Sequence, residues 1–157
     1  MKSAIVDFAE FDCKQVLVGR EEILRINPHR FEMALLDGIL FQTEERIVGF
    51  KDLAKDEFWV RGHFPGRPLM PGVLMCECAA QLSSYFALTN QMVSQGTVGL
   101  GGLDDVRFRG PVVPGDRLII MMKRNRSRHN VMFNADFQGY IDQELVVDGT
   151  ITGVVLK

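Results

Sequence analysis

Residues 62–86 read GHFPGRPLMPGVLMCECAAQLSSYF, and this stretch contains the signals that decide the fold. Six of its first eleven residues are Gly or Pro, so residues 62–72 cannot form a regular helix or strand. They predict a stiff loop that fixes His63, one of only three histidines. Pro71 suits the first position of a helix, where its missing N–H costs nothing. The stretch therefore predicts a rigid loop that leads directly into a helix.

The start of that helix is suited to stabilising an oxygen that becomes negative. Gly72 falls in the first turn, where its backbone N–H is not shielded by a side chain. The first turn of a helix has unsatisfied donors and a partial positive charge. We therefore expect an oxyanion-binding position beside His63.

The helix predicted from Pro71 to about Asn90 has apolar side chains on nearly every side, which is typical of a buried helix. Glu77, Gln81 and Ser84 are exceptions, and at about 100° per residue they fall within roughly 60° of one another. One interpretation is a solvated stripe. The other is a functional acid in apolar surroundings, where a carboxyl tends to stay protonated. The pattern of the helix alone leaves both open.

Composition narrows the classes of protein. A chain of 157 residues, 46% hydrophobic and 24% charged, is typical of one globular domain, and we expect a single domain over 1–157. The net charge of −2 argues against general nucleic-acid binding. No apolar run reaches the roughly 18 residues of a membrane span, and the first residues lack the pattern of a secretory leader. We therefore expect a cytoplasmic protein without membrane association.

The three cysteines do not suggest a cross-linked or metal-binding protein. Cys13, Cys76 and Cys78 are an odd number, and residues two apart on a helix face different directions. Cys76 and Cys78 are better interpreted as small buried hydrophobic residues in a reducing compartment.

The rest of the chain predicts mainly strands. A short helix is expected at Arg20–Ile26, and 34–42 fits either a strand or a short buried helix. Strands are expected over 46–53, 97–108, 117–125, 131–140 and 145–156, where apolar and polar residues alternate or Gly suggests close backbone approach. The apolar face of a sheet must be buried against another element, and a helix that is apolar on all sides must be surrounded by other elements. We therefore predict a strongly curved antiparallel sheet around the helix, with remaining apolar surface meeting a second subunit.

The block HFPGRPLMPGVLMCECAAQ, His63–Gln81, closely resembles the signature of the β-hydroxyacyl-acyl-carrier-protein dehydratases of fatty acid synthesis. The segments NPHRF and FRGPVVPGD resemble the same family in the same order. The resemblance implies an α+β hot-dog fold and dehydration of (3R)-hydroxyacyl thioesters to trans-2-enoyl thioesters. It implies no cofactor and no metal, a partner acyl carrier protein, and a homodimer that in many members assembles further into a trimer of dimers.

The resemblance also implies roles for individual residues. His63 and Glu77, contributed by opposite subunits, would be the catalytic base and acid. Gly72 and Val73 would offer backbone N–H groups to the thioester carbonyl. Gln81, one helical turn after Glu77, could hold the carboxyl in orientation. A Glu at this position, where an Asp marks the isomerising branch, favours a dehydratase without isomerase activity.

The chain departs from the family pattern between residues 31 and 38. Phe31-Glu32-Met33 stands where a Tyr-Pro-Phe type of run is usual, and Leu36-Asp37-Gly38 stands where Val-Asp-Arg is common. These departures affect substrate range and assembly contacts rather than the motif chemistry. Acyl chain length and the choice between carrier protein and coenzyme A are not readable from the sequence.

Several residues and functions keep two interpretations at this stage. His63 alone could be a loop histidine bonded to backbone, and His29-Arg30 could be solvated or catalytic. A basic run around the 123–129 hairpin end, together with Arg107 and Arg109, could dock a carrier protein or form a solvated turn; its central members are Arg124 and Arg126. The alternative functions are a hot-dog thioesterase and a non-catalytic acyl-carrier binding protein.

Overall fold

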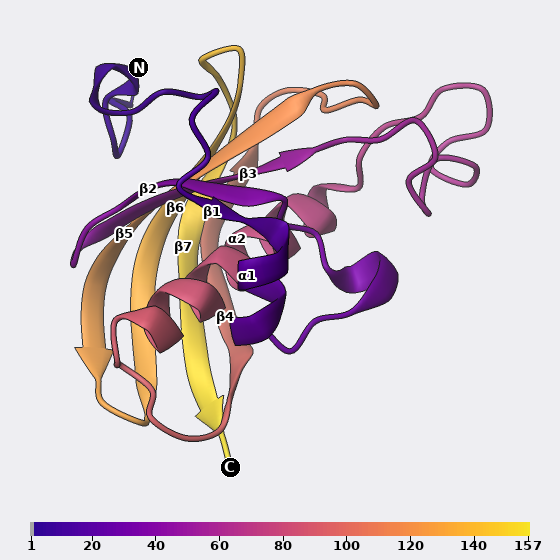
Figure 1. Ribbon diagram of the computed structural model, residues 1–157. Helices are drawn as coiled ribbons and strands as arrows, with labels where there is room; N and C mark the ends of the chain where they lie inside the picture. Colours follow the sequence, from indigo (N-terminus) through magenta and orange to yellow (C-terminus); the bar gives the residue numbers. More distant parts are fainter. Residues whose placement is uncertain (1) are drawn as a thin grey trace.

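The computed structural model describes residues 2–157 and shows one seven-stranded antiparallel sheet with a central helix (Figure 1). The strand order is β1-β2-β3-β5-β6-β7-β4, so β4 lies at one edge of the sheet. The elements are 3₁₀ helix η1 (Phe8–Glu10), β1 (Val18–Gly19), α1 (Arg20–Ile26), 3₁₀ helix η2 (Phe31–Met33), β2 (Gly38–Gln42), β3 (Arg46–Asp52), α2 (Gly72–Thr89), β4 (Thr97–Phe108), β5 (Arg117–Arg128), β6 (Met132–Ile141) and β7 (Glu144–Leu156).

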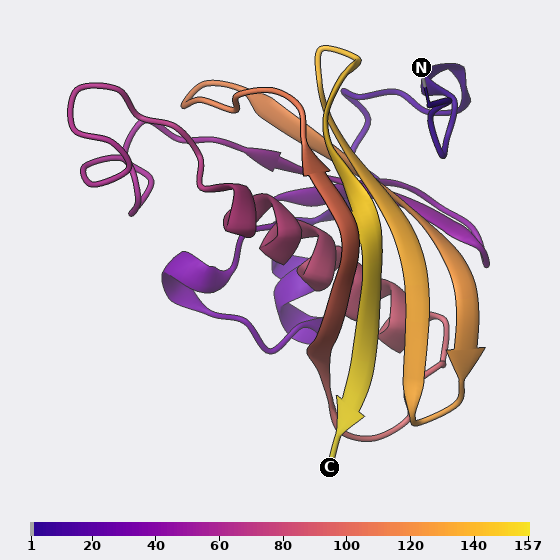
Figure 2. The same cartoon turned by 180° about the vertical axis from the view of Figure 1, so that it is seen from behind.

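The sheet curves around α2, as both views of the ribbon show (Figures 1 and 2). The main core lies between the helix and the inner face of the sheet, where Leu82 and Phe86 are fully buried. β3 comes so close to the helix that a Cβ on Gly49 would lie 2.8 Å from Leu82 Cδ1. The predicted sheet wrapped around a helix is therefore confirmed.

The outer face of the sheet is covered by the chain's own N-terminal segment, residues 2–17. Phe8 packs edge-on against Tyr140, and a second buried cluster forms beneath the segment. Polar contacts hold it as well: Ile5 N–H donates to Gln138 Oε1, and Lys2 Nζ lies 2.6 Å from the buried carboxylate of Asp148. Sequence patterns gave no signal for this segment, because few of its residues follow a helix or strand period.

The boundaries of most elements match the sequence-based expectations. The 34–42 segment forms a strand only from Gly38, and β5 continues to Arg128, three residues beyond the predicted end. Pro71 precedes the first helical residue rather than occupying it. Trp59, Cys76 and Cys78 are buried, as expected. Within residues 2–157, none of the helices has the length and apolar character to cross a membrane.

Asp148 provides a test of how the N-terminal segment is held. Burial alone would raise the pKa of Asp148, but hydrogen bonds from Arg109 and Lys2 outweigh it and lower the pKa below its ordinary value. Such a carboxylate stabilises the fold above about pH 4, and its contribution disappears as the pH falls through the folded-state pKa. Asp148→Asn should therefore lower the Tm at neutral pH and flatten the loss of stability on acidification.

The measurement is thermal unfolding of wild type and Asp148→Asn at a series of pH values. Asp142→Asn, in the exposed turn between β6 and β7, is the matched control and should keep the wild-type pH dependence. Equal acid sensitivity in wild type and Asp148→Asn would contradict this interpretation.

Candidate active site

The loop from residue 53 to 71 holds His63 in a frame of hydrogen bonds. His63 N–H donates to Trp59 O at 2.8 Å, and Leu69 N–H donates to His63 O at 2.8 Å. His63 Nδ1 lies 2.7 Å from Leu69 O. A carbonyl oxygen can only accept, so Nδ1 carries the hydrogen, and in the neutral ring Nε2 has the lone pair. The loop thus fixes both the orientation and the tautomer of the imidazole.

His63 opens into a mainly apolar pocket of about 480 Å³ at the N-terminus of α2. The pocket is also lined by Leu69, Met70, Gly72, Val73, Met75, Phe108, Gly110 and Pro111. The structure therefore brings together three predicted site residues, His63, Gly72 and Val73. The N–H groups of Gly72 and Val73 belong to the first turn, which has no intrahelical acceptors for them.

Gly72 is required here by packing as well as by its position. A Cβ at residue 72 would lie 2.8 Å from the ring of Phe108, which lines the same pocket. A side chain at this position would push Phe108 away. The absence of a side chain therefore shapes the pocket and leaves the helix terminus accessible.

Glu77 lies in a different, polar pocket of about 160 Å³, between α2 and strands β4 and β7. Its Oε1 accepts a hydrogen bond from Gln81 Nε2 at 2.9 Å. Gln81 is 2% exposed and also donates to Met33 O and accepts from Leu35 N–H. These contacts fix the amide on both sides, and the orienting role of Gln81 toward the Glu77 carboxyl stays a prediction. Gln81 and Ser84 are buried, so the solvated-stripe interpretation is wrong.

His29 is a further residue at the Glu77 pocket, which sequence reasoning left between a solvated and a catalytic role. Its Nε2 lies 3.6 Å from Glu77 Oε1, and its buried Nδ1 has no hydrogen-bond partner among residues 2–157. A buried N–H without an acceptor is costly, so the hydrogen belongs on Nε2, facing Glu77. His29 and Gln81 therefore both approach Oε1, and Oε2 accepts no hydrogen bond from the described residues. In the sequence, the NPHRF motif was the feature that could have indicated a role for His29 at the site.

His63 and Glu77 of one chain line different pockets. Helix geometry explains this, because Glu77 comes five residues after Gly72, about 7.5 Å along the axis and about 140° around it. A single chain therefore does not bring the predicted base and acid together. The prediction that they meet across two subunits stays a prediction.

The four predicted docking arginines fall into two groups. Arg107 and Arg109 flank the pocket residue Phe108 in the sequence, and Arg109 Nε is paired with Asp148 at 2.7 Å. Arg124 and Arg126 lie in the far half of β5, whose first residue, Arg117, pairs with Asp52 at the start of the loop. Arg124 is seven residues further, about 23 Å at roughly 3.3 Å per residue. Of the four, Arg107 and Arg109 are therefore the two next to a residue of the His63 pocket in the sequence, although neither lines it.

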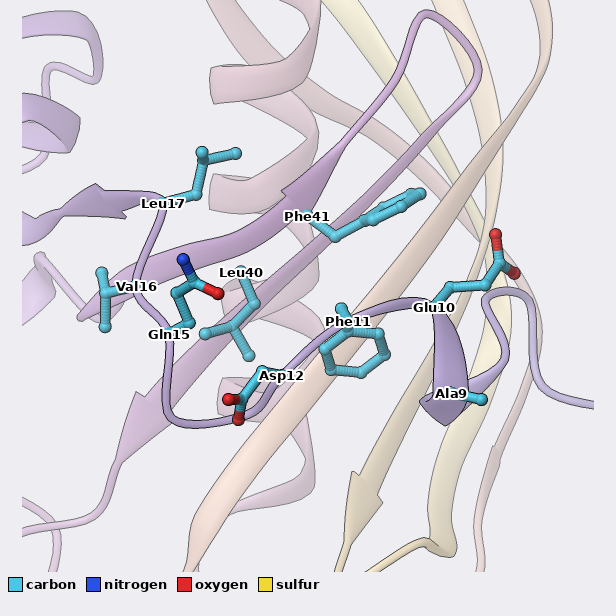
Figure 3. A pocket seen from close by; sticks show the side chains of 9 residues that line it. All are labelled: Ala9, Glu10, Phe11, Asp12, Gln15, Val16, Leu17, Leu40 and Phe41. Atoms are coloured by element: carbon cyan, nitrogen blue, oxygen red, sulfur yellow. The ribbon is translucent and has the colours of Figure 1, made fainter.

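A further groove, of about 600 Å³, is lined by none of these residues (Figure 3). It runs between the N-terminal segment and β2, with Phe11, Val16 and Leu40 among its walls. Its acidic Glu10 is already paired with Arg46. Among residues 2–157, no three His, Cys, Asp or Glu side chains are grouped so that they could hold a metal ion. The candidate site is therefore the pair of pockets on α2.

Comparison with known proteins gives one family over most of the chain. A family model described as a FabA-like domain matches residues 27–150. A 3-hydroxyacyl-acyl-carrier-protein dehydratase FabZ from Syntrophomonas wolfei is 39% identical over 138 residues, which are 87% of this chain and 94% of that protein. The FabZ of Syntrophobacter fumaroxidans is 37% identical over 135 residues, 85% of this chain and 91% of that protein.

Solved structures show the same fold at low sequence identity. The dehydratase heterocomplex ApeI:P from Xenorhabdus doucetiae has a TM-score of 0.74 at 16% identity and covers 86% of this chain and 91% of its own. A hypothetical thioesterase from Streptococcus pneumoniae with coenzyme A has a TM-score of 0.58 at 10% identity, covering 85% and 90%. These likenesses confirm the hot-dog architecture. With the family model matching residues 27–150, the chain belongs to the FabA-like family of β-hydroxyacyl-acyl-carrier-protein dehydratases.

Proposed function

We propose that this protein removes water from (3R)-3-hydroxyacyl thioesters of acyl carrier protein and forms trans-2-enoyl thioesters in fatty acid biosynthesis. The observation that carries the proposal is the placement of His63 Nε2, by the Nδ1–H bond to Leu69 O, in an apolar pocket at the N-terminus of α2. The FabZ names of the relatives support the same reaction.

His63 is the base in this proposal. The proton on C2 of a 3-hydroxyacyl thioester is weakly acidic, and an unprotonated imidazole nitrogen is available near neutral pH. As Nε2 takes that proton, the electron pair moves toward the thioester carbonyl and its oxygen becomes negative. The N–H groups of Gly72 and Val73, with the partial positive charge of the helix terminus, stabilise this oxygen.

Glu77 of the partner subunit is the acid. Elimination breaks the C3–O bond, and the leaving hydroxyl takes a proton from the carboxyl and departs as water. Gln81 and His29 both approach Oε1, so Oε2 is the oxygen that presents the proton. The reaction leaves His63 protonated and Glu77 ionised, and the enzyme is reset when His63 releases its proton and Glu77 takes one up.

The edge strand β4 supports a homodimer that has one site at each end of its interface. β4 pairs only with β7 within residues 2–157, so its other edge is unpaired there, and Leu100 and Leu103 of this strand are exposed. A long unprotected edge is a template for pairing with another chain. Residues 98–100 of β4 also line the Glu77 pocket, so a second copy at this edge would bring its own residues to Glu77.

Exchange of subunits tests the shared site. His63→Ala and Glu77→Gln should each lower the hydration of a crotonyl thioester by about 10²–10⁴-fold, because each removes a proton-transfer group. In a mixed dimer, one chain carries His63→Ala and the other carries Glu77→Gln. One of the two sites then contains both substitutions, and the other site contains the intact His63 of one chain and the intact Glu77 of the other. The two variants carry different tags, so that mixed dimers can be purified through both tags and assayed by the absorbance of the enoyl thioester. The mixed dimer should be more active than either parent variant. A mixed dimer as inactive as its parents would contradict the assignment.

The same assay separates the alternative functions. Release of free thiol from an acyl thioester, without interconversion of 3-hydroxyacyl and enoyl forms, would indicate a thioesterase. Substrate binding without either reaction would indicate a non-catalytic acyl-carrier binding protein.

We expect acyl carrier protein to dock through Arg107 and Arg109, the sequence neighbours of the pocket residue Phe108. Arg107→Glu should raise KM for a carrier-protein substrate by about fivefold or more at low ionic strength, because it weakens attraction to an acidic partner. KM for the corresponding coenzyme A thioester should stay near the wild-type value. Arg124→Glu, at the far end of β5, is the comparison variant, and the larger effect at Arg124 would contradict docking beside the pocket.

A further inference from the structure

β3 places a lysine among its core-facing positions. Residues alternate along the strand, with Ile47, Gly49 and Lys51 facing α2 and Val48 and Phe50 facing the outer cluster. Lys51 is only 5% exposed. A buried ammonium group is costly unless it is paired, so its partner indicates what the position is for.

The partner of Lys51 is Glu57, in the loop that follows β3. Lys51 Nζ lies 2.8 Å from Glu57 Oε1, and the carboxylate is also largely buried. The same oxygen accepts the N–H of Ala54, and the backbone carbonyl of Glu57 accepts the N–H of Val60. Glu57 is therefore fixed through both its side chain and its backbone.

The fixed segment leads directly to His63, six residues after Glu57. The carbonyl of Trp59, a buried residue, accepts N–H groups from both Gly62 and His63. The later part of the loop is anchored separately, by Met70 N–H donating to Val112 O. The Lys51–Glu57 pair thus anchors the first half of the loop that carries the catalytic imidazole.

The ion pair also lies against α2. Burial raises the pKa of the Cys78 thiol, while the nearby Lys51 charge acts in the opposite direction and Glu57 adds to the increase. Cys78 follows Glu77 directly in the helix. The charges of the pair are therefore close to the segment of α2 that carries the catalytic acid, as well as to the His63 loop.

Stability alone does not account for a buried ion pair at this position. Desolvation of two ions offsets their attraction, and apolar residues of similar volume are often as stable or more stable. An ion pair does, however, require one geometry, whereas apolar contacts tolerate small shifts.

We propose that the Lys51–Glu57 pair is a positioning device that holds the His63 loop in register with α2 for proton abstraction. This inference rests on the proposed function, in which His63 is the base. Lys51 and Glu57 are positioning residues, because they touch neither the substrate nor the reacting atoms.

The central experiment replaces the pair by apolar residues of similar size, Lys51→Met/Glu57→Leu. Each single change leaves an unpaired buried charge and should lower the Tm, whereas the double variant should recover it. Its kcat for crotonyl thioester hydration should nevertheless stay about 10–100-fold below wild type, with KM changed less than about twofold, because a misplaced base slows chemistry more than binding. Asp52→Asn, which breaks the exposed neighbouring pair with Arg117, is the control and should retain wild-type kcat.

NMR of the His63 ring separates this proposal from the proposed function. The Nδ1–H signal, protected in wild type by the bond to Leu69 O, should broaden or exchange faster in the double variant and in Glu57→Gln. A kcat within about twofold of wild type in the folded double variant, or an unchanged Nδ1–H signal in both variants, would overturn the positioning role. An inactive wild type would refute the proposed function, and the NMR comparison would still decide whether the pair positions the ring.

Discussion

The helix α2 has apolar side chains on nearly every side, and it can be stable only if it is enclosed. The curved inner face of the sheet supplies most of this enclosure, with Gly49 allowing β3 to approach Leu82 closely. The same constraint explains why the strands before and after the helix join into one continuous sheet. Burial of this helix therefore accounts for the positions of the strands that precede and follow it.

Enclosure of the helix also determines how the chemistry is distributed. The N-terminal turn, with His63 beside it, points into one pocket, and Glu77 points into another on a different side of the same helix. Since a straight helix cannot bring these two faces together, one chain holds two half-sites rather than a complete site. The proposed reaction depends on pairing each half-site with its complement from a second copy.

The parts of the fold that depend on regular patterns could be predicted from the sequence. Alternation identified β6 and β7, and the all-round apolar pattern identified α2. The N-terminal segment could not be predicted, because its covering role depends on contacts with distant residues such as Gln138 and Asp148. The predicted strand ended three residues before the C-terminal end of β5, because the charged residues there resemble a turn more than a strand.

The candidate site was predictable where its residues lie close together in sequence. His63, Gly72, Val73, Glu77 and Gln81 fall within one block. The first three line one pocket and Gln81 contacts Glu77 directly, but Glu77 lies in a polar pocket rather than in the apolar surroundings expected for it. His29 approaches Glu77 from a loop nearly fifty residues earlier, so no local spacing could show the contact. The Lys51–Glu57 pair was equally hidden, because a lysine in a strand and a glutamate in a loop are ordinary at the surface.

The covering of the outer sheet face has a consequence for larger assemblies. Without residues 2–17, the outer face of the sheet would expose a hydrophobic patch made of Leu40, Val48, Phe50, Ile119 and Met121. In the intact fold these residues are buried. Face-to-face stacking of sheets from neighbouring copies would therefore have to displace this segment. Contacts that leave residues 2–17 in place would involve the edge strand β4, the loops or the side of the molecule that carries the helices.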